Sequence, residues 1–305
     1  MQLKNREKLW AYGLGAMVGV WALFGLYDRT FREPAQPRRD KIARPRLERI
    51  VGISEFLALD PIECFRQAMR LQRSLEDQDE ILHWYHFTMV AVPVGSIPRA
   101  VVRWEGIEFS RHERIGEHRY RLHGHNLSFP RDLETGRFVD AVRNPVTGRT
   151  VAVPPMALTA DPGLVRSPAG VISLDRPSAP PRPDYRVLRR ENGFVKVDAI
   201  RVPPETWPVT FLEMGTEAAP AALFDDARLT WLPTEVSGAY VFPWPKWMEM
   251  ADAPGHMFAA WSGCKLRSID ELPREFRARA ERDFPQLLRV DRRAFDRPLP
   301  DLHPG

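Results

Sequence analysis

The stretch ILHWYHFTMVAV, residues 81–92 of this 305-residue chain, decides its fold. β-Branched and aromatic residues dominate it, and a similar run at 100–109 follows after a short segment that contains Gly and Pro. Residues of this kind favour extended strands, whereas Gly and Pro mark the turns between strands. The same pattern of β-branched and aromatic runs separated by Gly and Pro continues along the chain. Further strands are therefore expected at 119–129, 138–142, 150–153, 185–190, 194–200, 229–236 and 256–262.

Two loops among these strands have the residues of hairpin turns. Asp132–Gly136 and Asn144–Gly148 each begin with Asp or Asn and end with Gly, which suits a position of positive φ. The two turns lie twelve residues apart. The strands between them are therefore expected to be short antiparallel neighbours in a meander.

Helices are expected at both ends of this β-rich part. Asp60 suits an N-cap, Pro61 suits the first turn, and Glu63 completes a capping-box pattern. Ser268 and Glu271 are cap signals for a closing helix. This helix is expected to start at Leu272 and Pro273 and to have Phe276, Ala280 and Phe284 on one face. The sequence predicts a mainly β fold, a curved antiparallel sheet or barrel-like meander with flanking helices.

Near the start of the chain, residues 9–27 form a run of nineteen residues without a charge. At about 1.5 Å per helical residue it reaches about 28 Å, close to the ~30 Å hydrocarbon core of a bilayer. Lys4, Arg6 and Lys8 precede the run, and aromatic residues lie near both of its ends. We interpret it as a single-pass transmembrane anchor in a bacterial inner membrane, with a cleaved signal peptide as the alternative. Within it Gly15 and Gly19 would permit a helix-mediated dimer or a partner in a membrane complex.

The positive charge of the chain is concentrated beside this anchor. The formal net charge is +4, but residues 1–8 and 28–49 together carry +6, which leaves −2 for the remainder. A folded part without a basic excess argues against nucleic acid as a partner. The Arg-rich residues 28–49 are expected to contact anionic lipid headgroups, and their position favours a cytoplasmic body, although large domains can be translocated regardless of charge.

These features divide the chain into five parts. They are a flank at 1–8, the anchor at 9–27, an Arg- and Pro-rich tether at 28–49, a single β-rich domain at 50–297 and a tail at 298–305. The chain has only two cysteines, two hundred residues apart, which excludes a disulfide framework. One bridge between them would require an exported domain, and two free thiols are the favoured state.

One run of the sequence carries a family resemblance. FPWPKWMEMADAPG, residues 242–255, followed by Gly263 and Lys265, resembles the bacterial domain of unknown function family 1838. The same pattern covers Trp104-Glu105-Gly106 and the two turns described above. The resemblance implies a shared fold but no activity, substrate or cofactor. Members often carry an export signal, which would place the domain outside the cytoplasm. The positive charges of residues 28–49 favour the opposite location.

The Trp-rich part of this run is the favoured candidate for binding an apolar or lipid-like small molecule. Trp244, Trp247 and Met248 supply large apolar area, and Lys246 would fix one polar end of a ligand. An alternative interpretation is an ordinary strand whose alternate residues face the core. The other candidate ligand-binding residues are Trp104, Lys265, His123 and His125. The two His lack a third metal ligand, so no metal and no cofactor is expected.

A second hypothesis is an enzyme of unassigned type. If Glu105, Arg121 and Glu249 shared one interior, desolvation would raise a carboxyl pKa and provide a general acid or base beside a cation. The structural alternative is a buried cross-strand ion pair between Glu105 and Arg121, with Arg131 and Asp132 shaping a hairpin. No sequence signature of a serine hydrolase, zinc protease, P-loop or dinucleotide-binding protein is present.

Overall fold

The computed structural model describes residues 55–56, 59–158, 163–174, 187–191, 193–201, 212–250, 252–290 and 293. All of them belong to one compact unit, Gly52–Gly305. The expected anchor, tether and tail lie outside the described residues. Within the described part, no helix has both the length and the apolar character needed to cross a bilayer.

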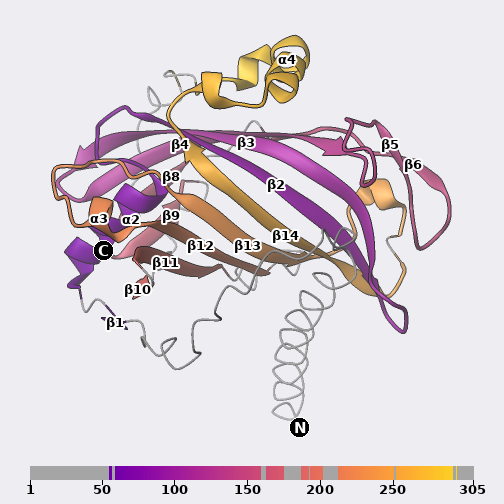
Figure 1. Cartoon of the computed structure of the whole chain (residues 1–305), viewed down its shortest axis with the longest axis horizontal. Helices are drawn as coiled ribbons and strands as arrows, with labels where there is room; N and C mark the ends of the chain where they lie inside the picture. Colours follow the sequence, from indigo (N-terminus) through magenta and orange to yellow (C-terminus); the bar gives the residue numbers. More distant parts are fainter. Residues whose placement is uncertain are drawn as a thin grey trace, which may run out of the picture. The chain divides into compact units, whose positions relative to one another are not determined.

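Strands make up most of the described chain (Figure 1). They are β1 (Glu55–Phe56), β2 (Glu80–Pro93), β3 (Arg99–Gly116), β4 (Arg119–Arg131), β5 (Ala141–Arg143), β6 (Thr150–Ala152), β7 (Met156–Leu158), β8 (Leu164–Ser167), β9 (Gly170–Ser173), β10 (Val187–Glu191), β11 (Phe194–Arg201), β12 (Leu212–Pro220), β13 (Glu235–Phe242) and β14 (Gly255–Leu266). The helices are α2 (Pro61–Gln72), α3 (Ala221–Phe224) and α4 (Arg274–Asp283), with single 3-10 turns η2 (Lys246–Met248), η3 (Ile269–Glu271) and η4 (Pro285–Leu287).

The main sheet consists of two antiparallel meanders joined by one long pairing. Its strand order is β1-β10-β11-β12-β13-β14-β2-β3-β4-β8-β9, with β7 also paired to β4. The central contact pairs β14 with β2 over twelve register positions, from Gly255 opposite Pro93 to Leu266 opposite Leu82. β5 and β6 form a separate two-stranded sheet. The expectation of a mainly β, curved antiparallel sheet is confirmed.

The sheet curls into a half-barrel around α2. Phe65, Met69 and Leu71 of this helix belong to one buried cluster with Tyr120 on β4 and Val197 on β11. β4 and β11 are six steps apart in the strand order, so only a curled sheet brings both against one helix. We call the face that packs on α2 the inner face. Figure 1 shows α2 and α3 within the curl.

Helix α4 covers part of the opposite, outer face. Phe276 and Ala280 are fully buried against outer-face residues of the sheet. These sheet residues are Leu82, Ile107, Phe109, Leu127, Phe129 and Leu266. The alternation of side chains along a strand therefore separates the outer-face core under α4 from the buried clusters of the inner face.

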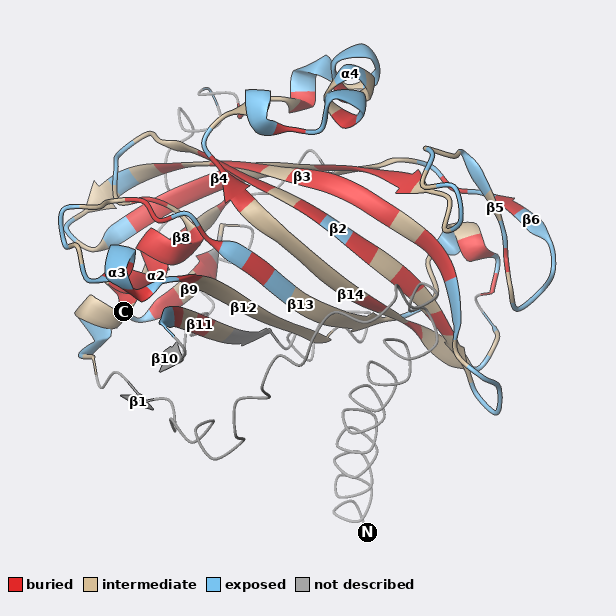
Figure 2. Ribbon diagram, in the orientation of Figure 1, coloured by how far each residue is buried: buried red, intermediate tan, exposed pale blue. Residues whose placement is uncertain are grey.

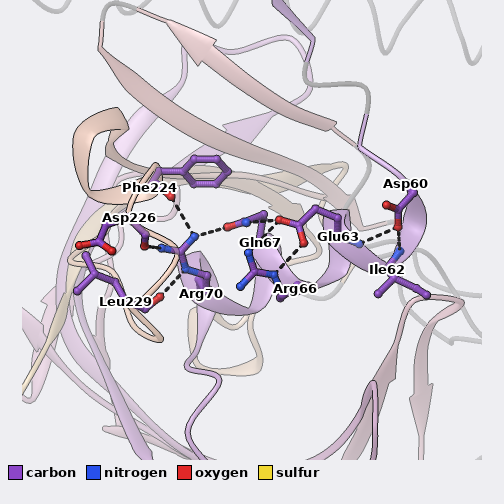
Figure 3. Close-up of polar contacts among 9 residues, drawn as sticks. All are labelled: Asp60, Ile62, Glu63, Arg66, Gln67, Arg70, Phe224, Asp226 and Leu229. Atoms are coloured by element: carbon purple, nitrogen blue, oxygen red, sulfur yellow. Dashed lines mark hydrogen bonds and ion pairs between the residues drawn. The ribbon is translucent and has the colours of Figure 1, made fainter.

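Asp60 caps the start of α2 as predicted, because it accepts hydrogen bonds from the backbone N–H groups of Ile62 and Glu63. The predicted capping box is not formed, since the Glu63 carboxylate pairs with Arg66 instead. The interior of α2 is fixed by Arg70, which is fully buried. The Arg70 guanidinium donates to the carbonyl oxygens of Leu229, Phe224 and Asp226, at 2.6, 3.0 and 2.6 Å (Figure 3). These bonds satisfy the last carbonyl of α3 and two carbonyls of the loop that follows it, so α2 holds this connection in place.

The end of α2 is closed by Lys265 of β14. Its Nζ donates to the carbonyl oxygens of Arg70, Leu71 and Arg73, at 2.9, 2.9 and 2.7 Å. These carbonyls lack intrahelical partners, and a cation there also suits the negative end of the helix dipole. Burial lowers the pKa of Lys265 well below its usual value, whereas three carbonyl acceptors favour the protonated amine, because only –NH₃⁺ has three donors.

The segment beside this helix end corrects one predicted strand. Residues 229–234 are not a strand; β13 begins at Glu235. Leu232 donates its backbone N–H to the carbonyl of Arg70, and the Thr234 hydroxyl donates to the carbonyl of Leu71. The apolar residues that suggested a strand, such as Leu232, are buried against α2 instead. Tertiary contacts here replace ladder hydrogen bonds.

Other boundaries were also wrong. Ser268 and Glu271 do form a capping box, but it caps the separate turn η3, and α4 starts only at Arg274. The predicted strand at 138–142 is reduced to β5, which with β6 leaves the main sheet. β1, β7, β8, β9, β12 and most of β13 were not expected. Both Asx–Gly turns are confirmed, with φ of 67° at Gly136 and 73° at Gly148.

We expect Lys265→Met to lower the free energy of unfolding by about 3 kcal/mol, because the substitution leaves buried carbonyls at the end of α2 without their charged donor. Urea unfolding of the full chain in detergent, followed by circular dichroism, measures this change. Lys246→Met is the matched control, because Lys246 is exposed on η2. Equal stability of the two variants would contradict the capping role of Lys265.

Candidate functional site

A row of polar side chains crosses the inner face where α2 ends. The strand register places Lys265 of β14 opposite His83 of β2, His83 opposite Glu108 of β3, and Glu108 opposite Asn126 of β4. We call these four residues the polar row. His83 and Lys265 are buried, whereas the Glu108 side chain is 36 % exposed. Solvent therefore reaches the row on the side of Glu108 and Asn126, which are both partly exposed.

Arg73, the C-cap residue of α2, joins two members of the polar row. Its guanidinium donates to Oε1 of Glu108 at 2.9 Å and lies 3.2 Å from Nδ1 of His83. Since arginine only donates, Nδ1 of His83 accepts and the ring proton belongs on Nε2. The imidazole thus presents an N–H donor on its far side, and the carboxylate of Glu108 is fixed by a charged partner.

Two histidines of the inner face are held in their neutral form. Burial, helped by the nearby Arg73 charge, lowers the pKa of His83 to about 3. Burial also lowers the pKa of His112, which lies on β3 beside Tyr120, to about 4. Both side chains are therefore uncharged at physiological pH.

Beside the polar row lies a set of aromatic side chains, which we call the aromatic cluster: Tyr85, Phe87, Trp104, Tyr240 and Trp261. Phe87 stacks on Trp104 with ring centroids 5.9 Å apart, and Tyr240 stacks on Trp261 at the same distance. Phe87 and Tyr240 meet edge to face at 6.4 Å. Phe87 and Trp104 are buried, while Tyr240 and Trp261 stay partly exposed.

Glycines let two of these rings lie flat on neighbouring strands. A Cβ atom at Gly238 would stand 2.5 Å from Cζ2 of Trp261, and one at Gly106 would stand 2.5 Å from Cζ of Tyr85. Any side chain at either position would push the ring off the sheet. The Gly in the Trp104-Glu105-Gly106 motif thus has a packing reason: it seats Tyr85, whose hydroxyl donates to Oδ1 of Asn126 in the polar row.

Trp261 brings an unused hydrogen-bond donor to this face. Its Nε1 is buried and has no hydrogen-bond partner among the described residues. Buried indole N–H groups normally have a partner. An apolar ring with one directed donor, next to a row of polar groups, suits a ligand that has a largely apolar body and a few polar atoms.

The Trp-rich run is a turn and not a strand. Lys246–Met248 forms η2, and Glu249 adopts a left-handed conformation with φ of 55°. Met248 is fully buried in the core around the aromatic cluster, and Trp244 and Trp247 pack partly buried against it. Lys246 is exposed. The run therefore packs against the aromatic cluster at one end of the half-barrel.

The remaining candidate binding residues lie on both faces of the sheet. Trp104 and Lys265 belong to the inner face, in the aromatic cluster and the polar row. His123 and His125 share the outer face of β4 with Phe129. His123 is buried and lies 3.3 Å from Nε of Arg121. The structure therefore does not bring the two His together with the other candidates.

The structure does not gather the three catalytic candidates. Glu105 is buried on the outer face, where its Oε2 pairs with Nη2 of Arg131 at 2.5 Å and its Oε1 accepts from Trp84. Arg121 faces Glu113 across the strands, at 3.9 Å. The residue of β4 opposite Glu105 is Phe129, which is eight residues from Arg121. At ~3.3 Å per residue this separation is about 26 Å. Glu249 is exposed and pairs with Arg149 at 2.6 Å. The proposed Glu105–Arg121 pair is therefore wrong.

The alternative roles of Arg131 and Asp132 are confirmed. Asp132 accepts from the backbone N–H groups of Glu134 and Thr135, and Arg131 donates to the carbonyl of Gly136. Hydrogen bonds within the turn hold the pKa of Asp132 below its usual value. Arg131 thus connects the turn to Glu105.

One Ser–His contact escaped the sequence analysis. Oγ of Ser262 on β14 lies 3.0 Å from Nε2 of His86 on β2, and Glu105 follows in the same outer-face row. Both oxygens of that carboxylate are engaged by Trp84 and Arg131, so it does not orient the imidazole as a catalytic triad requires. Only strand register could have revealed this row, because the three residues are remote in sequence.

Among the described residues, we find neither a cluster of metal ligands nor a cysteine with a lowered pKa. No group of three or more His, Cys, Asp or Glu side chains among them is arranged to hold a metal ion. Cys64 on α2 and Cys264 on β14 are both free and partly buried. Burial raises the pKa of each thiol, which makes the reactive thiolate rarer.

We expect the stability of the protein to fall as the pH drops below 6.5, because the unfolded chain then protonates histidines that the folded chain keeps neutral. Between pH 6 and 4, each of His83 and His112 should lower the free energy of unfolding by about 1.4 kcal/mol for every unit that the pH drops. His83→Gln should remove one of these two contributions in denaturant titrations of the full chain across this range. An unchanged slope in His83→Gln would show that His83 titrates equally in both states.

Protein-family models, curated proteins and solved structures yield no match to this chain. The family resemblance described above therefore remains an expectation based on its motifs.

Proposed function

We propose that this protein is a membrane-anchored binding protein whose inner sheet face takes up an apolar or lipid-like small molecule. The observation that carries the proposal is the stacked pair of Tyr240 and Trp261, which stays partly exposed on the same face as the polar row. Aromatic side chains contribute large apolar contact area, and a few fixed polar groups orient a ligand.

The strand geometry sets the size of such a ligand. Trp261 and Lys265 are four residues apart on β14 and face the same side, a separation of about 13 Å at ~3.3 Å per residue. Glu108 lies two strands across from Lys265, about 10 Å at ~4.8 Å per strand, so a ligand with its apolar body on Trp261 and its polar end at Arg73 and Glu108 would span about 16 Å.

The expected anchor at residues 9–27 supports the choice of ligand class, because it would keep the domain beside a source of lipid-like molecules. With this anchor, the proposed location is the bacterial inner membrane, which the chain would span once. An enzyme finds less support, because Glu105, Arg121 and Glu249 lie in three separate ion pairs. The resemblance to family 1838 implies that its other members share this fold, but it implies no activity for them.

Photocrosslinking tests the proposal on the full chain in phospholipid nanodiscs. We expect a fatty acid with a photoreactive diazirine to label peptides that contain Tyr240 or Trp261, and an excess of unlabelled fatty acid to suppress the labelling. Trp261→Leu should reduce labelling about tenfold, because loss of an aromatic contact of this size corresponds to about 1.4 kcal/mol. Mass spectrometry of the digested protein gives the labelled positions.

The matched control is Phe258→Leu. Phe258 is partly exposed on the same strand but belongs to the outer face, opposite Val241 and Val90. This variant should retain the labelling. Labelling spread equally over both faces, or unaffected by Trp261→Leu in a variant that still folds, would refute binding on the inner face.

A further inference from the structure

The two most exposed large apolar side chains of the described residues lie in one turn. Val94 and Ile97, in the connection between β2 and β3, are 71 % and 79 % exposed. Between them Gly95 has φ of +75°, and a Cβ atom added there would meet no heavy atom within 4 Å. The turn therefore projects from the end of the half-barrel, and Figure 2 shows it as exposed.

A second projecting turn lies beside the first. Nη1 of Arg99, at the base of the β2–β3 turn, donates to the carbonyl of Pro145 at 2.8 Å. Pro145 precedes Val146, which is 37 % exposed in the turn between β5 and β6. The side-chain amide of Asn144 donates to the carbonyl of Met248, which holds η2 against the same turn. Three separate segments thus meet at one end of the half-barrel.

The charges of these segments are mainly positive. Residues 94–99, 143–149 and 246–252 hold four cations against two acids. The cations are Arg99, Arg143, Arg149 and Lys246, and the acids are Glu249 and Asp252. Arg149 pairs with Glu249 at 2.6 Å, and the β2–β3 turn itself contains no acid. We call Val94, Ile97 and Val146 with these cations the tip surface.

We propose that the tip surface docks on an anionic lipid bilayer, with Val94 and Ile97 entering the interface and the cations contacting lipid headgroups. Narrow projecting turns with apolar ends suit insertion between headgroups, whereas a protein partner is normally met by a broader patch. Basic residues next to inserted apolar residues favour anionic lipid. The uncharged run at 9–27 would hold this surface near the membrane, so the proposal uses the expected anchor but not the proposed ligand.

A fluorophore at position 97 reports directly on docking. Ile97→Cys, labelled with the polarity-sensitive dye NBD, is placed in the full chain and reconstituted in nanodiscs of phosphatidylcholine alone or with one third phosphatidylglycerol. We expect a blue-shifted emission and at least threefold stronger quenching by lipids that carry a spin label in the acyl chain, both increasing with phosphatidylglycerol. The unsubstituted chain, labelled in parallel, gives the background from Cys64 and Cys264.

The matched control is Ile62→Cys. Ile62 is 46 % exposed at the start of α2, which packs near the opposite end of β4 from the tip surface. Its dye should report water and little quenching. Arg99→Gln combined with Lys246→Gln should remove the dependence on phosphatidylglycerol while leaving the fold intact.

Two results would overturn the proposal. The first is equal emission and equal quenching at positions 97 and 62. The second is a blue shift at 97 without quenching by the spin-labelled lipids, because it would mean that another protein, such as a second copy of this chain, covers the turn. Neither result bears on fatty-acid labelling at Trp261, so the two proposals fail separately.

Discussion

The structure depends on the need to satisfy the carbonyl groups at the end of a helix that lies inside a curled sheet. α2 ends on the inner face, where its last carbonyls are surrounded by protein rather than water. Lys265 of β14 donates to three of them, and Leu232 and Thr234 donate to two of the same groups. A helix end without such donors would leave several buried acceptors unpaired, at about 1–3 kcal/mol for each. This requirement fixes where α2 ends, and hence where Arg73 is placed.

The polar row follows from that placement. Once α2 ends beside β14, its C-cap residue Arg73 reaches His83 and Glu108 on the two next strands. Burial keeps the imidazole neutral, and the guanidinium holds the carboxylate. The aromatic cluster lies further along the same strands, because successive inner-face residues of β2 change from His83 to Tyr85 and Phe87. One face of three strands thus combines a polar end with an apolar end.

The two faces of the sheet have different roles. On the outer face, the ion pair of Glu105 with Arg131 and the packing of α4 stabilise the structure. On the inner face, the partly exposed aromatic residues and the polar row supply the candidate binding site. Strand alternation makes this separation possible, since neighbouring residues such as Trp104 and Glu105 point to opposite sides. Glu105 therefore lies on the opposite side of the sheet from Trp104 and the polar row.

Local chemistry determined a large part of this fold from sequence. The capped start of α2, both Asx–Gly turns and the long strands were predictable, because caps, turns and β-branched runs act over a few residues. Residues 229–234 were mistaken for a strand, because apolar residues look alike whether they pair in a sheet or cover a helix. The membership of the candidate site was decided only by the tertiary structure. Arg73, His83, Glu108 and Lys265 come from four elements spread over nearly two hundred residues, and only strand register and the curl bring them together.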